Sequence, residues 1–180
     1  MIYLFLAPGF EETEAICPLD LMKRGGLDVK TVAVGDTLTV TSTRGITVTA
    51  DLLLKDLPED APEGVILPGG MPGADNLNIP QVHKHLHACH QKGGLVAAIC
   101  AAPYVLGEQG LLQGKRAVCY PGFEDRLLGA TVENAPTVKD GTLLTAVGMG
   151  ASVAFGLQIV AHFKGEQEAE RIAKAIFAPI

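Results

Sequence analysis

Residues 93–103 read GGLVAAICAAP, and this order predicts a buried strand that turns sharply into a helix. The five apolar residues Leu95 to Ile99 suit a short buried strand, and the two glycines before them suit a turn. Pro103 fits the first turn of a helix, because the missing N–H costs nothing there. Cys100 is therefore expected on the turn itself, with a positive φ that strains a residue carrying a Cβ.

The position of Cys100 indicates a functional thiol. Free N–H groups and the helix dipole near its sulfur would favour the thiolate, which is the reactive form of cysteine. Some hydrolases place their nucleophile on the same kind of strand-to-helix turn. The alternative is a buried structural thiol, which is the commoner role for a free cysteine. The turn favours the functional interpretation.

Strand and helix signals alternate on both sides of this turn. Strands are predicted at residues 2–7, 29–34, 64–67, 95–99 and 117–119, and helices at 12–24, 80–91, 102–109, 149–163 and 166–176. Two hairpins are expected, one at residues 38–49 around Arg44 and one at residues 137–145 around Gly141. This order predicts an α/β fold, with an open, doubly wound, mostly parallel sheet and helices on both faces. A single domain is expected over residues 1–180.

Composition excludes several classes of function. The 180 residues are 48% hydrophobic, carry a net charge of −6 and include no tryptophan. Because no stripe of Lys and Arg appears, we expect no specific nucleic-acid partner. No apolar segment is long enough to span a bilayer, and the start of the chain lacks a basic leading region, so no membrane partner is expected. Four cysteines without CxxC spacing suggest free thiols in a reducing cytoplasm.

Glu14 is the candidate partner of Cys100. In doubly wound sheets the ligand site lies beyond the C-terminal ends of the strands, where residues 8–14, residues 68–70 and Cys100 should meet. Favourable interaction with the helix dipole explains at least two of the carboxylates in residues 11–14. Glu14, one turn into the helix, is placed to lean toward the sulfur and share one proton with it. A buried glutamic acid with a raised pKa would then act as general acid and base beside a thiolate.

The turn Pro68-Gly69-Gly70 supplies the third candidate element. Glycine permits a positive φ and a close approach of backbone, so the simpler interpretation is a plain turn. The functional interpretation is an oxyanion hole made by the N–H groups of Gly70 and Ala101. A thiolate, a carboxyl group and paired N–H donors suit addition to a carbonyl carbon.

Four segments together resemble the ThiJ/PfpI superfamily, and within it the branch of the parkinsonism-associated deglycase and its bacterial relative YajL. The segments are EETE at 11–14, LPGGMPGA at 67–74, AAICAAP at 97–103 and TAVG at 145–148. The resemblance implies a flavodoxin-like fold, a homodimer and no cofactor or metal. It also implies an easily oxidised Cys100 whose sulfur is hydrogen-bonded by Glu14.

Two functions follow from this resemblance and the residues. The first is an enzyme that converts small α-oxoaldehydes such as methylglyoxal to hydroxy acids without glutathione, or removes early methylglyoxal adducts from glycated side chains. The second is an oxidative-stress sensor and redox-regulated chaperone in which Cys100 is oxidised to the sulfinic acid. The two use the same residues, so the sequence does not separate them.

At some positions this chain differs from the family pattern, and these differences limit which activities of the family are expected. Protease members carry His directly after the nucleophile, where this chain has Ala101, so a peptidase is not expected. Tyr120 stands where relatives often have His, and it is a poor base near neutral pH. Arg24 and Arg44 match basic positions that in relatives approach the pocket mouth or the dimer contact. The alternative for both is solvated surface charge or a turn residue.

A histidine-rich stretch at residues 83–90 is the other unusual feature. His83, His87 and His90 share one helix face, but no carboxylate joins them, so an exposed helix that binds metal only adventitiously is favoured. Cys119 is expected to be a packing residue. Whether it lies close enough to Cys100 to take part in its oxidation is left open.

Overall fold

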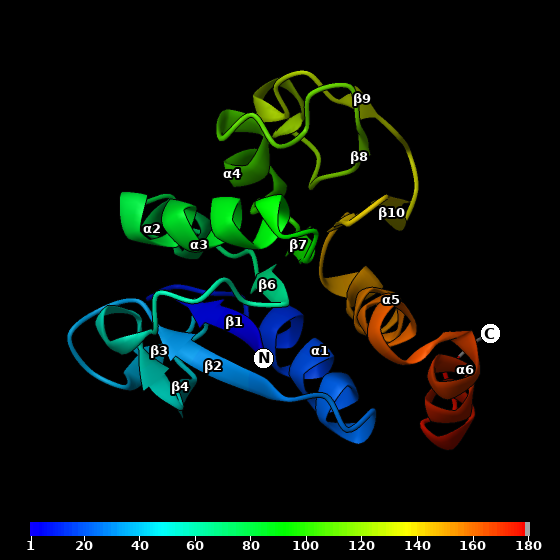
Figure 1. Ribbon diagram of the computed structural model, residues 1–180, viewed down its shortest axis with the longest axis horizontal. Helices are drawn as coiled ribbons and strands as arrows, with labels where there is room; N and C mark the ends of the chain where they lie inside the picture. Colours follow the sequence, from blue (N-terminus) through cyan, green and yellow to red (C-terminus); the bar gives the residue numbers. More distant parts are fainter. Residues whose placement is uncertain (179–180) are drawn as a thin grey trace.

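A seven-stranded sheet runs through the middle of the computed structural model, which describes residues 1–178 (Figure 1). In spatial order its strands are β10 (Thr137–Asp140), β11 (Leu143–Ala146), β7 (Leu95–Ile99), β6 (Gly64–Leu67), β1 (Ile2–Leu6), β2 (Val29–Ala33) and β5 (Leu52–Leu53). Neighbouring strands are parallel except for the antiparallel pair β10 and β11. The predicted mostly parallel, flavodoxin-like sheet in one domain is confirmed.

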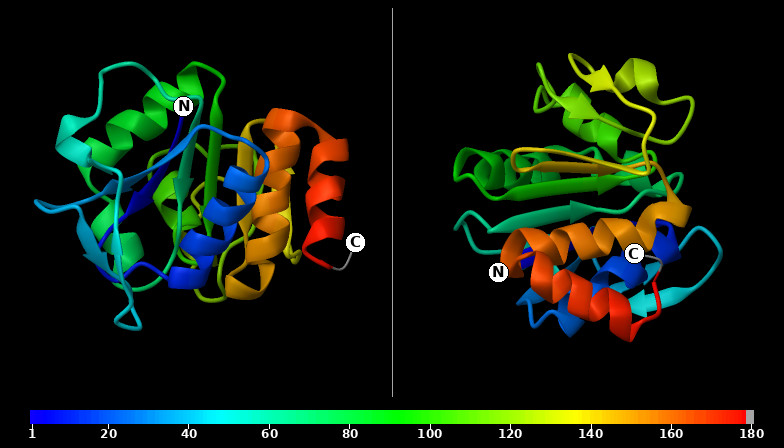
Figure 2. Two further views of the ribbon diagram at one scale, coloured as in Figure 1. Left: turned by 90° about the horizontal axis from the view of Figure 1, so that it is seen from below. Right: turned by 90° about the vertical axis from the view of Figure 1, so that its right-hand side faces the viewer.

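Helices cover both faces of this sheet (Figures 1 and 2). One face carries α1 (Glu12–Arg24) and α5 (Ser152–Lys164), with α6 (Glu166–Ala175) packed against α5; the other carries α2 (Gly73–Leu77), α3 (Pro80–Gln91) and α4 (Pro103–Glu108). Every helix within residues 1–178 is too short or too polar to cross a bilayer.

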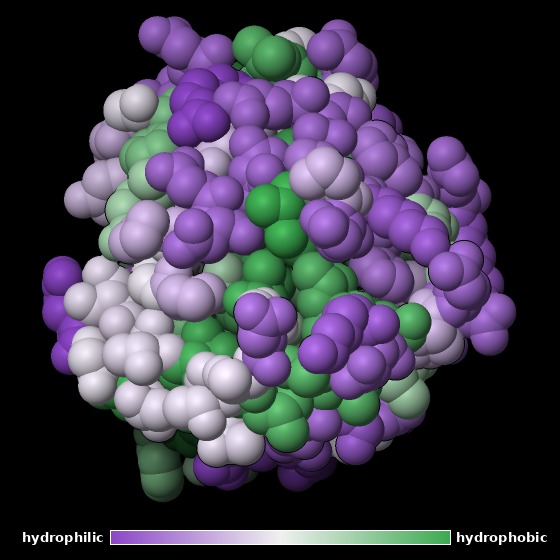
Figure 3. Space-filling model, turned by 90° about the vertical axis from the view of Figure 1, so that its left-hand side faces the viewer, coloured by the Kyte–Doolittle hydropathy of each residue, from purple (hydrophilic) through white to green (hydrophobic). Residues whose placement is uncertain are grey.

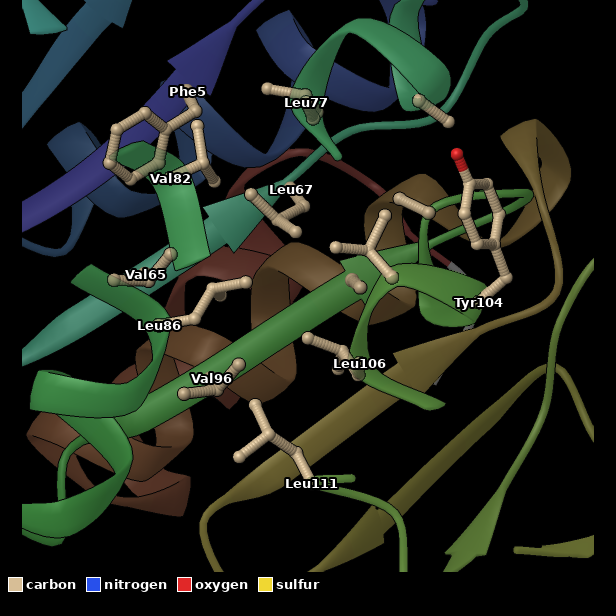
Figure 4. Packing of buried hydrophobic residues seen from close by; sticks show 14 of the residues in the cluster. Phe5, Val65, Leu67, Leu77, Val82, Leu86, Val96, Tyr104, Leu106 and Leu111 are labelled. Carbon is tan, nitrogen blue, oxygen red and sulfur yellow. The ribbon is translucent and has the colours of Figure 1, made fainter. Parts of the chain in front are cut away.

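The strands are buried on both sides, which explains their continuous apolar runs. Successive side chains of a strand point to opposite faces. Phe5 therefore belongs to the core cluster under α3 and α4, whereas Leu4 and Leu6 belong to the cluster under α1 and α5. Figure 4 shows Phe5 packed with other residues of the first cluster, among them Leu67 and Val96.

Two hairpins and three short elements complete the fold. The hairpin of β3 (Thr39–Thr41) and β4 (Thr47–Thr49) is confirmed, as is the hairpin of β10 and β11. The short 3-10 helices are η1 (Leu54–Asp56), η2 (Glu124–Arg126) and η3 (Met149–Ala151), the last of which replaces the predicted start of α5.

The predicted strand at residues 117–119 is wrong in its extent. The structure has β8 (Arg116–Ala117), which pairs with β9 (Thr131–Val132) in a separate small sheet. The strand ends there because the Val118 N–H donates to the Thr145 side-chain oxygen at 2.9 Å instead of to a neighbouring strand. Cys119 therefore lies in a loop.

Candidate functional site

Cys100 lies on the turn between β7 and α4 with a φ of 65°, as predicted. Residues other than glycine rarely adopt this conformation. Two backbone hydrogen bonds hold the turn. The Cys100 N–H donates to the Ala146 carbonyl at 2.9 Å, and the Cys100 carbonyl accepts from the Tyr120 N–H at 2.8 Å. The end of β11 and the loop at Tyr120 therefore fix the position of the thiol.

Glu14 lies in the first turn of α1 and is only 1% exposed. Its carboxyl group hydrogen-bonds to the Cys100 side chain and accepts a hydrogen bond from the Gly69 N–H at 3.0 Å. The helix start is fixed in turn by Glu11, whose carboxylate accepts from the Glu14 N–H at 2.6 Å. The residue predicted to lean toward the sulfur is thus placed against it.

The two glycines after β6 permit this close approach. A Cβ on Gly69 would lie 2.6 Å from the Cys100 Cβ and 2.6 Å from the Glu14 carboxylate. Gly70 has a φ of 88° and packs against backbone at Gly9 and Glu11. The N–H groups of Gly70 and Ala101 both hydrogen-bond the Cys100 sulfur. The paired donors of the predicted oxyanion hole therefore face the thiol.

Burial dominates the electrostatics of this pair. It raises the pKa of Glu14 to about 7, although hydrogen bonds from Cys100 and Gly69 oppose the shift. Burial also raises the pKa of the Cys100 thiol, and the neighbouring Glu14 carboxylate raises it further, because two adjacent anions repel. The N–H groups of Gly70 and Ala101 act in the opposite direction.

The sign for Cys100 differs from the sequence expectation. A helix N-terminus alone would lower the thiol pKa, but here the buried surroundings and the carboxyl group outweigh the N–H donors. The pair therefore gives up one proton near neutral pH and retains the other. A thiolate forms in this site when the thiol proton moves to Glu14.

A recess of about 350 Å³ opens above the sulfur. Its lining includes Arg44 and Tyr120, both predicted, together with Met71 and Met149. Sequence reasoning missed the two methionines. The available signal was their position, because each directly follows a glycine turn at the C-terminal end of a strand.

Comparison with known proteins shows the family of this chain. The model of the DJ-1/PfpI family matches residues 1–162. The chain belongs to this family. Protein dj-1beta of Drosophila melanogaster is 33% identical over 176 residues, which are 96% of this chain and 94% of that protein. A DJ-1 superfamily protein from Salmonella typhimurium, 34% identical, superposes with a TM-score of 0.95 over 99% of this chain and 98% of its own.

One DJ-1/PfpI relative carries the name of an activity. The glutathione-independent glyoxalase DJR-1.2 of Caenorhabditis elegans is 31% identical over 92% of this chain and 89% of its own length. Other relatives are longer: this chain spans 39% of the length of DJ-1 homolog B of Arabidopsis thaliana, at 35% identity.

Arg24 is the predicted residue that does not reach the DJ-1/PfpI recess. It lies at the last turn of α1, about 15 Å along the helix from Glu14. Its guanidinium pairs with Asp20 at 2.6 Å, and both side chains are about half exposed. The expectation of a pocket residue was wrong for Arg24, because the axis of α1 runs away from the recess.

The histidines of α3 contact different partners. His83 hydrogen-bonds Asn78 at 2.7 Å, and His87 hydrogen-bonds Gln109 at 3.3 Å. Within residues 1–178, no group of His, Cys, Asp and Glu is arranged to hold a metal ion.

Cys119 belongs to the core cluster under α3 and α4, whereas Cys100 packs against the cluster on the opposite face of the sheet. The two thiols are therefore packed with different core clusters. All four cysteines are free.

Proposed function

We propose that this protein is a cofactor-independent enzyme that converts small α-oxoaldehydes to hydroxy acids, with Cys100 as nucleophile. The observation that carries the proposal is the contact between the Glu14 carboxyl group and the Cys100 sulfur, beside the N–H groups of Gly70 and Ala101. The relative named a glutathione-independent glyoxalase supports the same assignment. The substrate class suits a recess of about 350 Å³, which accommodates a molecule the size of methylglyoxal.

The first half of the reaction forms a covalent adduct. The thiol proton moves to Glu14, and the sulfur adds to the aldehyde carbon. The carbonyl electrons move to oxygen, where the N–H groups of Gly70 and Ala101 stabilise the negative charge. Glu14 then gives its proton to this oxygen, leaving a neutral hemithioacetal and a carboxylate.

The second half moves one hydrogen between neighbouring carbons. The Glu14 carboxylate takes the proton from the former aldehyde carbon, and the electron pair enters an enediolate. Glu14 returns the proton to the adjacent carbon, while the hydroxyl proton of the first carbon passes to the oxygen of the second. The second carbon thereby becomes an alcohol carbon and the first becomes a thioester. Water hydrolyses the thioester to a hydroxy acid and restores the thiol. The reaction consumes one water and needs no external oxidant or reductant.

Glycated side chains are a second substrate class for the same chemistry. Met71, Tyr120 and Met149 lie at the recess and are each at least 44% exposed, so the recess is open to solvent on that side. An early methylglyoxal adduct on a protein side chain presents the same carbons to Cys100.

The decisive assay uses purified protein with methylglyoxal in the absence of glutathione. We expect lactate to form at the rate at which the aldehyde disappears, and Cys100→Ser to reduce this formation by about 10³-fold or more. The matched control is Cys119→Ser, which removes a thiol from the other face of the sheet and should retain activity. Aldehyde loss without lactate would contradict the proposal, because it would indicate simple adduct formation.

A redox sensor is the second candidate, and one observation favours it. The carboxyl group of Glu14 and the two N–H donors that surround the sulfur would also hydrogen-bond the oxygens of a sulfinic acid. We expect limiting peroxide to oxidise Cys100 before Cys17, Cys89 or Cys119, as followed by mass spectrometry. If oxidation abolishes turnover and produces binding of unfolded client proteins, the sensor and chaperone role is the regulated one.

We also propose a symmetric homodimer. Ile16 on α1 and Ile46 in the β3–β4 hairpin are 40% and 51% exposed, and they offer apolar surface for a self-complementary contact. Light scattering at micromolar concentration should give twice the chain mass. Ile46→Lys should shift the protein toward monomer, and a wild-type protein that is monomeric throughout would refute the proposal.

A further inference from the structure

Tyr104 connects three segments that surround the Cys100 recess. It lies in α4 and is fully buried. Its hydroxyl donates to the Asp75 carboxylate in α2 at 2.6 Å. Figure 4 shows the hydroxyl of Tyr104 directed to the side of the view on which Leu77 of α2 lies. The bond therefore ties α4 to α2 above the core.

The ring of Tyr104 holds the third segment, the loop at residues 120–127. The guanidinium carbon of Arg126 lies 3.3 Å from the ring centroid, a cation–π contact. The ring of Phe123 is nearly parallel to it, at 6.0 Å between centroids and 14° between planes. Arg126 is anchored in turn by Glu108 at 2.8 Å. The loop is thereby held against α4 at Phe123 and at Arg126.

Each of these three segments carries one component of the site. Helix α2 directly follows the turn of Gly70, and the Ala74 N–H donates to the Gly70 carbonyl at 2.8 Å. Helix α4 directly follows Ala101, whose carbonyl accepts from the Tyr104 N–H at 3.1 Å. The loop begins with Tyr120 at the recess. The Tyr104 side chain thus connects α2 and α4, which follow the two N–H donors, with the loop that forms part of the recess wall.

We infer that Tyr104 is a positioning residue that sets the separation of the Gly70 and Ala101 N–H groups around the Cys100 sulfur. This inference rests on the proposed function for its effect on turnover, but not for its effect on the thiol itself. Oxyanion donors act only within a narrow range of distance from the oxygen. A substitution far from the reacting atoms that displaces such a donor slightly can therefore lower the rate steeply. The ring would maintain packing without the hydroxyl, so the hydroxyl to Asp75 bond is the part that positions the turn.

The test compares Tyr104→Phe with Tyr3→Phe. Tyr3 belongs to the same core cluster and is 2% exposed, so the matched control loses a hydroxyl from the same side of the sheet, far from the recess. We expect Tyr104→Phe to lower kcat about 10-fold with KM changed less than about twofold. The plateau rate of Cys100 alkylation by iodoacetamide above pH 7 should fall, because the Gly70 N–H no longer stabilises the thiolate as well. Tyr3→Phe should change neither quantity.

Two variants of Asp75 keep the inference testable if Tyr104→Phe folds poorly. Asp75 is exposed, so its substitution spares the core. Asp75→Ala should reproduce both effects, whereas Asp75→Asn retains an acceptor oxygen and should preserve wild-type behaviour. An unchanged alkylation profile in folded Tyr104→Phe and Asp75→Ala would overturn the inference and leave Tyr104 as a packing residue. If wild-type protein does not turn over methylglyoxal, the proposed function fails, while the alkylation profiles still decide the role of Tyr104.

Discussion

The recess at Cys100 and a second, larger hollow lie on different parts of the molecule. The second is a groove of about 590 Å³ between α3 and the connection from β5 to β6. Leu54, Leu57 and Ile79 line it, together with His85, which is 8% exposed. A strip of hydrophobic surface is visible among hydrophilic side chains on the face in Figure 3. The groove exists because the β5–β6 connection contains the short η1 turn and no α-helix.

The larger of the two hollows is not the one that contains the reactive groups. Burial lowers the pKa of His85 in the groove, and the carboxylate of Glu59 opposes this shift. The smaller recess contains a strained residue and two buried groups that share a proton. A strained backbone beside a coupled titratable pair therefore indicates the reactive region better than volume does.

Substitution of one side chain in each region should give the largest difference in turnover. Cys100→Ser should reduce lactate formation by about 10³-fold or more, because the hydroxyl of serine is far less nucleophilic than a thiolate. Leu57→Ser, in the wall of the groove, should retain turnover even though it lowers stability. Equal loss of activity in the two variants would mean that the groove takes part in the reaction.

Substitution of one titratable side chain in each region should give the next largest difference in turnover. Glu14→Gln keeps a hydrogen-bond donor for the sulfur but cannot accept and return a proton, so turnover should fall about 10²-fold. The Cys100 thiol should stay protonated near pH 7, because burial raises its pKa and no carboxylate is left to accept its proton; absorbance near 240 nm follows the thiolate. His85→Phe keeps the ring volume in the groove and should leave turnover unchanged. Full activity in Glu14→Gln would leave Glu14 as a helix-terminus charge only.

The pH dependence of the thiol distinguishes the regions further. The reactive form of the pair has lost one proton, and burial raises the pKa of that loss, at Glu14, to about 7. Alkylation of Cys100 should therefore rise about tenfold per pH unit below this value and level off above it. His85→Phe should show the same profile. A rate that keeps rising well beyond pH 8 would instead indicate an isolated thiol with a high pKa.

The smallest effect concerns stability. Gly69→Ala places a Cβ within 2.6 Å of both Cys100 and Glu14, so it should destabilise the fold by about 1–3 kcal/mol in urea unfolding. Gly150→Ala is the control, because its Cβ would meet nothing within 4 Å. If the two variants have the same free energy of unfolding, the contact of Gly69 with the pair is not tight.

The sequence predicted the elements whose signals are local. Residues 95–103 contain both the apolar run and the proline that mark the turn, and glycine turns mark both hairpins. The two-residue β5 and the five-residue α2 were missed, because elements of this length carry too little periodicity.

The electrostatics of the site depend on contacts remote in sequence. Burial of the Cys100 sulfur involves Glu14 and the turn at Gly70, which lie far from it along the chain, so the rise in the thiol pKa was not predictable from the helix N-terminus. The position of Arg24 depends on the direction in which α1 leaves the recess. Both quantities are properties of the packed fold and not of any single stretch.

The positive φ of Cys100 lowers folding stability at the position that carries the proposed nucleophile. Glycine adopts this conformation without strain, whereas a residue with a Cβ loses about 1 kcal/mol or more. Random substitution at this position therefore includes a change, Cys100→Gly, that relieves strain while it removes the nucleophile. A lineage under selection for stability alone would drift toward that glycine.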